Sequence, residues 1–447
     1  MSQKHDLVVI GTGAAASEAA HTCRAAGWDI AVVDCHPFGG TCALRGCDPK
    51  KVLVGAADVL GLSRRMQGRG IGSKTLTIDW SELMRFKRTF TEPVPEAKEH
   101  GFEKAGIRAL RGTARFLDVS TLQVGEEVLS TRHVVIAAGA RPAPLGIPGE
   151  GHLVTSTNFL ELEHLPERIV FVGGGYIAME FAHIAARAGA RATILHRGER
   201  PLEPFDTDLV GWLMEATQAA GIELLVRHPV EAVERAGGEF QVHVSGGRTI
   251  AADLVVHAAG RVPDLDDLDL EAAGVERGKR GVIVNEFLQS TSNPAVYAAG
   301  DAAASEGLPL TPVAGLEGRT AAANLLKGNH LTPDYHGTPS VVFSLPPLAT
   351  VGLTEAAARQ AGLRFGVKQG DTSGWYSSRR LNETHSGFKV LVEEGTEQIL
   401  GAHLLGHHAD EVINLFAVAM RAGLTATTLK ETLYAYPTSA SDLRYML

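Results

Sequence analysis

Short apolar runs alternate with alanine-rich or amphipathic stretches along most of the chain. The first run, Leu7–Ile10, enters a glycine turn and an alanine-rich stretch, and a second apolar run follows at Ile30–Val33. The same order returns at Ile169–Val172 and Ala192–Leu195. Continuous apolar runs of this length are typical of buried strands in parallel sheets. The pattern therefore predicts an α/β fold that contains an internal repeat of strand, glycine turn, helix and strand.

Further apolar runs and breaks predict where the chain divides. Each repeat returns with one more apolar run, which ends at Gly139 in the first copy and at Gly260 in the second. A proline-rich exit follows Gly139, and a helix over Leu316–Leu326 leads into a linker at Gly328–Pro339. We therefore expect four segments, 1–150, 151–264, 265–333 and 334–447, the last built from alternating strands and helices.

Composition narrows the class of protein. The 447 residues exceed one ordinary hydrophobic core, and 45% hydrophobic with 21% charged residues is typical of a globular chain. A net charge of -9 argues against a broadly basic nucleic-acid surface, so small-molecule partners are expected. Charge or glycine interrupts every apolar run well before the ~20 residues of a membrane span, and the first strand leaves no room for a signal peptide. These features predict a cytoplasmic protein with no membrane partner.

The two glycine turns predict two dinucleotide sites. Gly11, Gly13 and Ala16 open the first helix, and Gly173 and Gly175 open its counterpart. Glycines at these positions let the backbone approach a pyrophosphate at a helix N-terminus, where free N–H groups favour anions. A single fingerprint is weak evidence, but two copies in the same strand-to-helix context indicate Rossmann-like domains.

The ends of the second strands predict different nucleotides. Asp34 closes the first repeat, where a carboxylate binds ribose hydroxyls and repels a 2'-phosphate, as FAD or NAD requires. The second repeat ends without a carboxylate, and Arg197 and Arg200 follow instead. Arginines there favour NADPH, although NADH and an alternative reading as a solvated charged loop stay open.

A close cysteine pair is the strongest chemical signal. Cys42 and Cys47 follow the first repeat directly, and in an ideal helix they would lie about 140° apart, so bonding them requires a distorted turn that Gly46 would ease. Pro49 suits the first turn of a helix that continues to Met66, and a helix N-terminus favours the Cys47 thiolate. Two buried cysteines or half of a zinc site are the alternatives, but further ligands at metal spacing are absent.

The other two cysteines and one pair of histidines are expected to have structural and not chemical roles. Cys23 and Cys35 are interpreted as packing residues of the first repeat. His407 and His408 are adjacent and are expected to point in different directions, so a solvated loop is favoured over a metal site. We therefore assign no metal ligands.

At Gly39-Gly40-Thr41-Cys42 through Cys47, and at Pro49-Lys50-Lys51, the sequence resembles the pyridine nucleotide-disulfide oxidoreductases. This family includes glutathione reductase, dihydrolipoamide dehydrogenase and mercuric reductase. Tyr297–Asp301 and Leu310–Ala314 match further family motifs, and the last region resembles the dimer-interface domain. The resemblance implies FAD-binding, NAD(P)H-binding, central and interface domains in that order, with a homodimer that shares its active sites.

The resemblance also implies roles for individual residues. Cys42 would be the interchange thiol and Cys47 the charge-transfer thiol beside the flavin. Lys50 and Glu180 would form an ion pair near flavin N5, and Tyr176 would cover the nicotinamide pocket. The cofactor-binding positions expected from the motifs and the resemblance are Gly11, Gly13, Ala16, Asp34, Gly40, Thr41, Lys50, Gly139, Asp301, Thr311, Gly173, Gly175, Tyr176, Arg197 and Gly260.

Departures from the family leave the electron acceptor open. Disulfide-reducing relatives carry a histidine and a carboxylate in the C-terminal motif, where this chain has Tyr436 and Ser441. A tyrosine is a poor proton shuttle at neutral pH. Mercuric reductases carry a tyrosine in this region, but their C-terminal cysteine pair is missing here. We expect an NADPH-dependent FAD reductase of a disulfide or related acceptor, with a metal-ion or quinone reductase or a redox sensor as alternatives.

Overall fold

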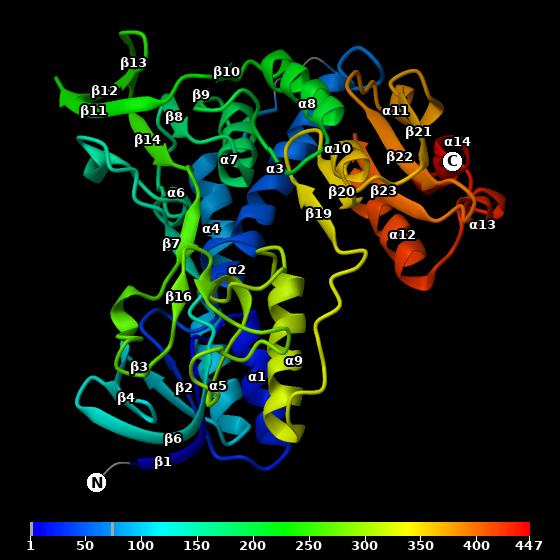
Figure 1. The fold of residues 1–447 in the computed structure, drawn as a ribbon. Coiled ribbons are helices and arrows are strands. Elements are labelled where there is room, and N and C mark those ends of the chain that lie inside the picture. The colour runs from blue at the N-terminus through cyan, green and yellow to red at the C-terminus, as the bar shows by residue number, and fades with distance from the viewer. Residues whose placement is uncertain (1–2, 73–75) are drawn as a thin grey trace. The chain divides into compact units, whose positions relative to one another are not determined.

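The chain forms two compact units, each assembled from three separate segments. The computed structural model describes residues 3–72 and 76–447 (Figure 1). Unit 1 contains residues 1–50, 86–143 and 260–335, and unit 2 contains residues 51–85, 144–259 and 336–447. The division falls within two helices, α3 (Cys47–Arg65) and α4 (Trp80–Thr91). The mixture of parallel sheets and helices confirms the predicted α/β class.

Unit 1 is built around a seven-stranded sheet. In hydrogen-bonded order its strands are β3 (Arg108–Arg111), β2 (Ile30–Asp34), β1 (Gln3–Ile10), β6 (Glu127–Ile136), β5 (Thr121–Val124) and β4 (Ala114–Asp118), with β18 (Val296–Ala298) also paired to β6. The strands from β3 to β6 are parallel, and β18 runs parallel to β6. The apolar run in β1 is completely buried, as expected of a strand that is covered on both faces.

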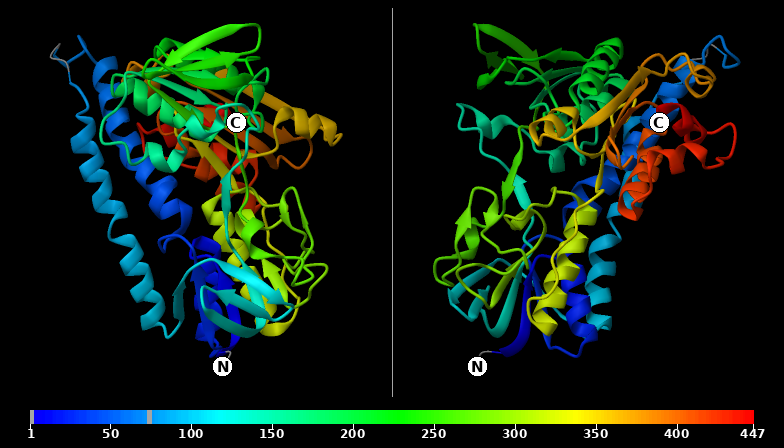
Figure 2. Two further views of the ribbon diagram at one scale, coloured as in Figure 1. Left: turned by 90° about the vertical axis from the view of Figure 1, so that its left-hand side faces the viewer. Right: turned by 45° about the vertical axis from the view of Figure 1, so that its right-hand side comes forward.

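Several helices belong to unit 1. They are α1 (Ala14–Ala25), α2 (Gly40–Arg45), α5 (Val94–Lys104) and α9 (Thr311–Lys327), with the short turns η2 (Asp266–Leu268) and η3 (Gly300–Ala302) and the small strands β7 (Ala140–Pro142), β15 (Arg261–Pro263), β16 (Arg277–Gly278) and β17 (Gly281–Val282). Helices α1 and α9 lie side by side (Figures 1 and 2). A Cβ at Gly318 would lie 2.3 Å from the Ala15 carbonyl oxygen, so only glycine permits this approach.

Two expected helix bounds differ from the observed ones. Helix α9 begins at Thr311, five residues before the predicted start, because Pro312 is well suited to a first helical turn. Helix α3 ends at Arg65, one residue before the predicted end. The predicted division into four domains remains a prediction.

Unit 2 contains a parallel sheet that repeats the order seen in unit 1. Its strands are β10 (Glu223–Leu225), β9 (Arg191–Leu195), β8 (Arg168–Val172) and β14 (Leu254–His257), with a separate antiparallel sheet of β11 (Val230–Ala236), β12 (Glu239–Val244) and β13 (Arg248–Ala252). The helices nearest to it in sequence are α6 (Ser156–Phe159), α7 (Tyr176–Arg187) and α8 (Thr207–Ala219), with the turn η1 (Glu150–His152). The two predicted repeats are therefore both present.

The C-terminal part of unit 2 is an antiparallel sheet with helices against it. The strands are β19 (Pro339–Val342), β20 (Leu348–Gly352), β23 (Ile399–Leu405), β22 (Gly387–Glu393) and β21 (Phe365–Asp371). The helices are α10 (Glu355–Gln360), α11 (Tyr376–Arg379), α12 (Ala409–Ala422), α13 (Ala426–Glu431) and α14 (Leu443–Met446), with the turn η4 (Ser439–Asp442). Helix α12 packs its apolar stripe, which includes Ile413 and Phe416, against this sheet (Figure 1).

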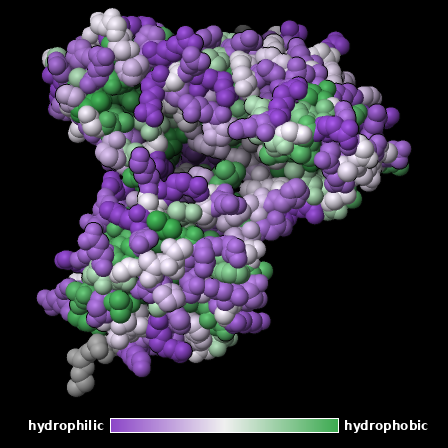
Figure 3. Space-filling model, viewed as in Figure 1, coloured by the Kyte–Doolittle hydropathy of each residue, from purple (hydrophilic) through white to green (hydrophobic). Residues whose placement is uncertain are grey.

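Neither the visible surface nor the helices of the described residues have the features of a membrane-spanning segment. On the face in Figure 3, small hydrophobic areas are interrupted by hydrophilic residues. Within residues 3–72 and 76–447, no helix is both long enough and apolar enough to cross a bilayer.

Candidate active site

The first glycine fingerprint forms a cradle of bare backbone in unit 1. Gly11 has φ +111°, and a Cβ there would lie 2.3 Å from the Ala137 carbonyl oxygen. Gly40 has φ +73°, and its Cβ would lie 2.5 Å from the Cα of Gly13 at the start of α1. The turn that begins α2 therefore reaches the start of α1 only because Gly40 lacks a side chain.

A hydrogen-bond chain joins this cradle to the strand-end carboxylate. The Thr12 hydroxyl donates to Oδ2 of Asp34 at 2.6 Å, and the N–H of Gly39 donates to the same hydroxyl at 3.1 Å. The N–H of His36 donates to Oδ1 of Asp34 at 2.9 Å. The Asp34 carboxylate thus accepts two hydrogen bonds at the end of β2, one from the first glycine turn and one from the residues that follow the strand.

The two cysteines lie on separate helices that meet at Gly46. Cys42 lies in α2, which ends at Arg45, and Cys47 is the first residue of α3. A Cβ at Gly46 would lie 2.8 Å from the Thr41 carbonyl oxygen, so glycine allows the chain to turn sharply here. The helix is interrupted where the spacing of the cysteines required a distortion, and the break brings the two thiols into hydrogen-bond contact.

Polar groups surround both thiols. The Sγ of Cys42 donates to Oδ1 of Asp48 at 3.7 Å, and the Sγ of Cys47 lies 3.7 Å from the Thr311 hydroxyl at the start of α9. The hydrogen bond with Cys47 and burial raise the pKa of the Cys42 thiol, and the charge of Asp48 acts in the same direction. Thr311, expected from the family motif, therefore lies at the cysteine pair.

The loop with Asp301 is held by a buried carboxylate that the sequence analysis did not identify. Glu317 on α9 is 1% exposed and accepts from the Gly300 N–H at 2.6 Å. It also accepts from the hydroxyls of Ser305 at 2.6 Å and Tyr335 at 2.7 Å. Burial raises the pKa of Glu317 and, despite the charge of Arg261, that of Asp301. The sequence signal that could have identified Glu317 is that it is the single carboxylate in a helix rich in small apolar residues.

The second fingerprint lies in unit 2 and leaves space at its helix start. Gly173 has φ +130°, and a Cβ there would lie 2.1 Å from the Ala258 carbonyl oxygen. A Cβ at Gly175, which precedes α7, would meet no described atom within 4 Å. The second repeat therefore combines close strand packing with an open approach to the helix N-terminus.

The two arginines after β9 differ in their contacts. Arg200 donates to the carbonyl oxygens of Phe205 at 2.9 Å and Glu203 at 3.0 Å, so its guanidinium organises the loop. Arg197 is exposed, and within the described ranges its guanidinium has no hydrogen bond or ion pair. Arg197 is thus the one of the two that is available to an anion.

Tyr176 and Glu180 project from successive turns of α7 into polar contacts. The Tyr176 hydroxyl lies 2.5 Å from the Ser340 hydroxyl, and burial raises the pKa of the tyrosine. Glu180 is 1% exposed, lies 3.4 Å from Lys51 Nζ and accepts from the Phe343 N–H at 2.9 Å. The Glu180 carboxylate therefore has a cationic partner within unit 2, and the expected pairing with Lys50 stays a prediction.

The two remaining cysteines differ in burial. Cys23 is fully buried in α1, and burial raises its pKa to about 12, which confirms its packing role. Cys35 is exposed at the end of β2, so the packing interpretation is wrong for it. Gly139 (φ +73°) and Gly260 (φ +110°) both have open space at the Cβ position and lie in unit 1.

The C-terminal motif is largely exposed. Tyr436 is 81% exposed, and Ser441, which occupies the usual carboxylate position, donates to the Thr438 carbonyl oxygen at 2.6 Å. Among the described residues, no cluster of three or more histidines, cysteines or carboxylates could hold a metal ion.

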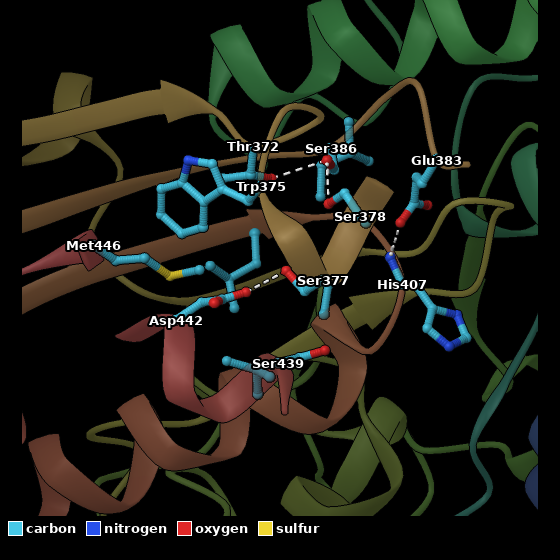
Figure 4. Close-up of a pocket in the computed structure, with 16 residues that line it drawn as sticks. Thr372, Trp375, Ser377, Ser378, Glu383, Ser386, His407, Ser439, Asp442 and Met446 are labelled. Atoms are coloured by element: carbon cyan, nitrogen blue, oxygen red, sulfur yellow. Dashed lines mark hydrogen bonds between the residues drawn. The ribbon is translucent and has the colours of Figure 1, made fainter. Parts of the chain in front are cut away.

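A small polar cavity lies in the C-terminal region, apart from every predicted site residue. Its volume of about 40 Å³ admits only a few water molecules. The Ser386 hydroxyl bonds to those of Thr372 and Ser378, and Glu383 accepts from the His407 N–H at 2.9 Å (Figure 4). Its polar groups satisfy one another, so we interpret the cavity as structural.

Comparison with known proteins identifies the family. Residues 5–318 match the family described as "Pyridine nucleotide-disulphide oxidoreductase", and residues 338–447 match its dimerisation domain. Mercuric reductase of Staphylococcus aureus is 34% identical over 98% of this chain and 81% of its own length. Glutathione reductase of a Nostoc species is 32% identical over 99% of both chains.

Solved structures agree with this result. The Cu(II) complex of the HOCl-induced flavoprotein disulfide reductase RclA from Escherichia coli has a TM-score of 0.89 and 28% identity over 99% of both chains. The matches confirm the resemblance inferred from the cysteine motif, the enzyme class and, through the dimerisation domain, the homodimer. The chain therefore belongs to the pyridine nucleotide-disulphide oxidoreductase family, which consists of FAD- and NAD(P)H-dependent flavoenzymes.

Proposed function

We propose that this enzyme transfers electrons from NADPH, through FAD, to the Cys42–Cys47 pair and then to a disulfide or related thiol-reactive acceptor. The observation that carries the proposal is the contact between the two thiols at the α2–α3 junction. The pair lies in the same unit as the glycine cradle and beside Thr311 at the start of α9. Such contact is what reversible formation of a disulfide requires.

The residues of unit 1 fit FAD. Side chains at Gly11 and Gly40 would collide with the backbone, so the turn before α1 stays free of side chains at these positions. The first N–H groups of α1 are then available to a pyrophosphate. Asp34 is held where it can accept from ribose hydroxyls. We assign the remaining FAD contacts to Gly13, Ala16, Thr41, Lys50, Gly139, Asp301 and Thr311. When bound, the flavin supplies hydride and electron transfer, and the protein supplies position and charge.

The residues of the second repeat fit a nicotinamide dinucleotide. The open space at Gly175 supports binding of the pyrophosphate, with Gly173 and Gly260 as further backbone positions. Arg197 is exposed and follows a strand that lacks a terminal carboxylate, which supports NADPH over NADH. Tyr176 would cover the nicotinamide, and Glu180 would pair with Lys50 near the flavin as well as with Lys51.

The homodimer completes the proposed site. Tyr436 exposes 81% of its surface, which supports a role facing Cys42 of the partner subunit. A tyrosine hydroxyl can donate a hydrogen bond to a departing thiolate, although it cycles protons poorly at neutral pH. We also propose the four-domain division at residues 150, 264 and 333, and a cytoplasmic location, which suits a redox-active cysteine pair.

A thiophilic metal ion is the second candidate acceptor. The observations in its favour are the similarity to mercuric reductases, the Cu(II) complex of RclA and the tyrosine in place of the tail histidine. Quinones are a further class of acceptor to include in a test.

An anaerobic acceptor screen tests the proposal. Purified protein with FAD and NADPH is supplied in turn with glutathione disulfide, other small disulfides, a quinone, Hg²⁺ and Cu²⁺, and NADPH oxidation is followed. Disulfide turnover that is lost in Cys42→Ser supports the proposal, and turnover of metal ions alone favours the second candidate. Turnover that persists in Cys42→Ser refutes a role for the pair, and no turnover with any acceptor favours a redox sensor.

A further inference from the structure

A carboxylate lies beside the Cys42 thiol of the redox pair. Asp48 is the second residue of α3, directly after Cys47, and its Oδ1 accepts from the Cys42 Sγ at 3.7 Å. This contact is made within one subunit, by the helix that also carries Cys47.

The other groups near Cys42 differ from Asp48 in charge. The Cys47 thiol and the Thr311 hydroxyl act on Cys42 from α3 and α9, and both are neutral when protonated. Arg45 precedes the break at Gly46 and acts on Cys35 and Arg261 instead. Lys50 follows Asp48 by two positions, so the two side chains point to different sides of the helix. Asp48 is therefore the carboxylate that acts on Cys42, and the ionised Cys47 thiol is a second negative charge beside it.

The Asp48 carboxylate could either accept the Cys42 proton as a general base or stabilise the protonated thiol by its charge, and ordinary pKa values distinguish the two roles. An ordinary carboxyl group has a pKa near 3.9 and an ordinary thiol near 8.5, so transfer of a thiol proton to a carboxylate is in general disfavoured by more than about 10⁴-fold. Asp48 is therefore a poor general base for Cys42. A negative charge about 4 Å away instead stabilises the protonated thiol relative to the thiolate.

We propose that Asp48 is a positioning residue that keeps the proton of the reduced pair on Cys42 and leaves the negative charge on Cys47. This inference rests on the proposed function. The hydride of NADPH carries two electrons and one proton, so reduction of the disulfide yields NADP⁺, one thiol and one thiolate, and the equation balances. The Cys47 thiolate is the one assigned to the flavin side, so the charge lies where it can interact with oxidised FAD.

The ionisation of Cys42 is consistent with this distribution. The hydrogen bond with Cys47 is the largest cause that raises the pKa of Cys42, burial is the second, and the charge of Cys47 and then that of Asp48 add to both. The Thr311 hydroxyl opposes them. Cys42 is therefore expected to attack acceptors slowly at neutral pH and faster as the pH rises through its raised pKa.

Site-resolved alkylation of the reduced holoenzyme tests the inference. The full chain with FAD is reduced anaerobically by NADPH and treated with iodoacetamide between pH 6 and 10, and the modified cysteines are quantified by peptide mass spectrometry. Cys42 should react with an apparent pKa above 8.5. Asp48→Asn should react about fivefold faster at Cys42 at pH 7.5, whereas Asp48→Glu should react like the parent.

Two controls separate this effect from general changes. Cys35 is exposed and is not in contact with Asp48, so its alkylation rate should be equal in all variants. Glu103→Gln removes an exposed carboxylate of α5 and should leave Cys42 unchanged. An apparent pKa of Cys42 below 8.5 in the parent, or equal Cys42 rates in the parent and Asp48→Asn, would overturn the inference. If NADPH releases no reactive thiol at either Cys42 or Cys47, the proposed function fails instead.

Discussion

Replacement of Glu317 by alanine should loosen the loop that carries Asp301. The carboxylate is 1% exposed and accepts three hydrogen bonds of 2.6 to 2.7 Å, from Gly300, Ser305 and Tyr335. Hydrogen bonds to a charged group contribute about 1.5–3 kcal/mol each, and the burial that raises the pKa of Glu317 offsets part of this sum. Three half-buried donors would lose their acceptor, so we expect a net loss of about 3 kcal/mol.

The expected loss can be measured as a thermal shift and as cofactor retention. A change of about 3 kcal/mol lowers the Tm of a unit of this size by roughly 6–12 °C. Because Gly300 directly precedes Asp301, the variant should also release FAD more readily during gel filtration. Glu317→Gln retains an acceptor oxygen and should fall between the alanine variant and the parent.

The matched control is Glu286→Ala, which removes an exposed carboxylate from the same unit. It should change the Tm by less than about 2 °C. If Glu317→Ala behaves like this control in both assays, the three hydrogen bonds do not hold the loop and the reasoning is refuted.

Three further predictions concern the nucleotide, the acceptor and pH. Arg197→Glu should lower the kcat/KM ratio of NADPH to NADH at least about tenfold, since the exposed cation is replaced by a like charge to the phosphate; an unchanged ratio in steady-state assays would refute this. Tyr436→Phe should slow the acceptor half-reaction in rapid-mixing experiments and leave flavin reduction nearly unchanged, and the reverse result would contradict the proposed geometry. Burial lowers the pKa of His183 in the folded protein to about 3, whereas the unfolded chain takes up this proton below about pH 6.5. The contribution of the neutral His183 to the free energy of unfolding is therefore complete above pH 6.5, and about 2 kcal/mol of it is lost by pH 5. Denaturant titrations at both pH values should show a smaller loss in His183→Gln.

Much of the fold could be predicted because local patterns determine it. The apolar runs at Leu7 and Ile169 each enter a glycine turn, and in each case the structure shows a strand followed by a helix. Helix α9 was predicted too short because its first turn contains no apolar periodicity and depends on Pro312.

Parts of the site could not be predicted because they depend on contacts that are distant in sequence. Glu317 lies 17 positions from Gly300, and the sequence alone does not show that the two meet. Cys35 follows a buried strand, which favoured a packing role, but the strand ends one residue earlier. The contact between Asp48 and Cys42 depends on the break at Gly46, which changes the relative direction of two short helical segments.

Anaerobic reduction followed by visible absorbance tests the central claim most directly. The account predicts that about two electrons per subunit produce a long-wavelength charge-transfer band from a Cys47 thiolate beside oxidised FAD. Cys47→Ser should lack this band, whereas Cys42→Ser, which retains Cys47, should show it without added reductant. A band that persists in Cys47→Ser, or a parent protein that accepts two electrons without forming the band, would contradict the assignment of the Cys42–Cys47 pair as the electron relay.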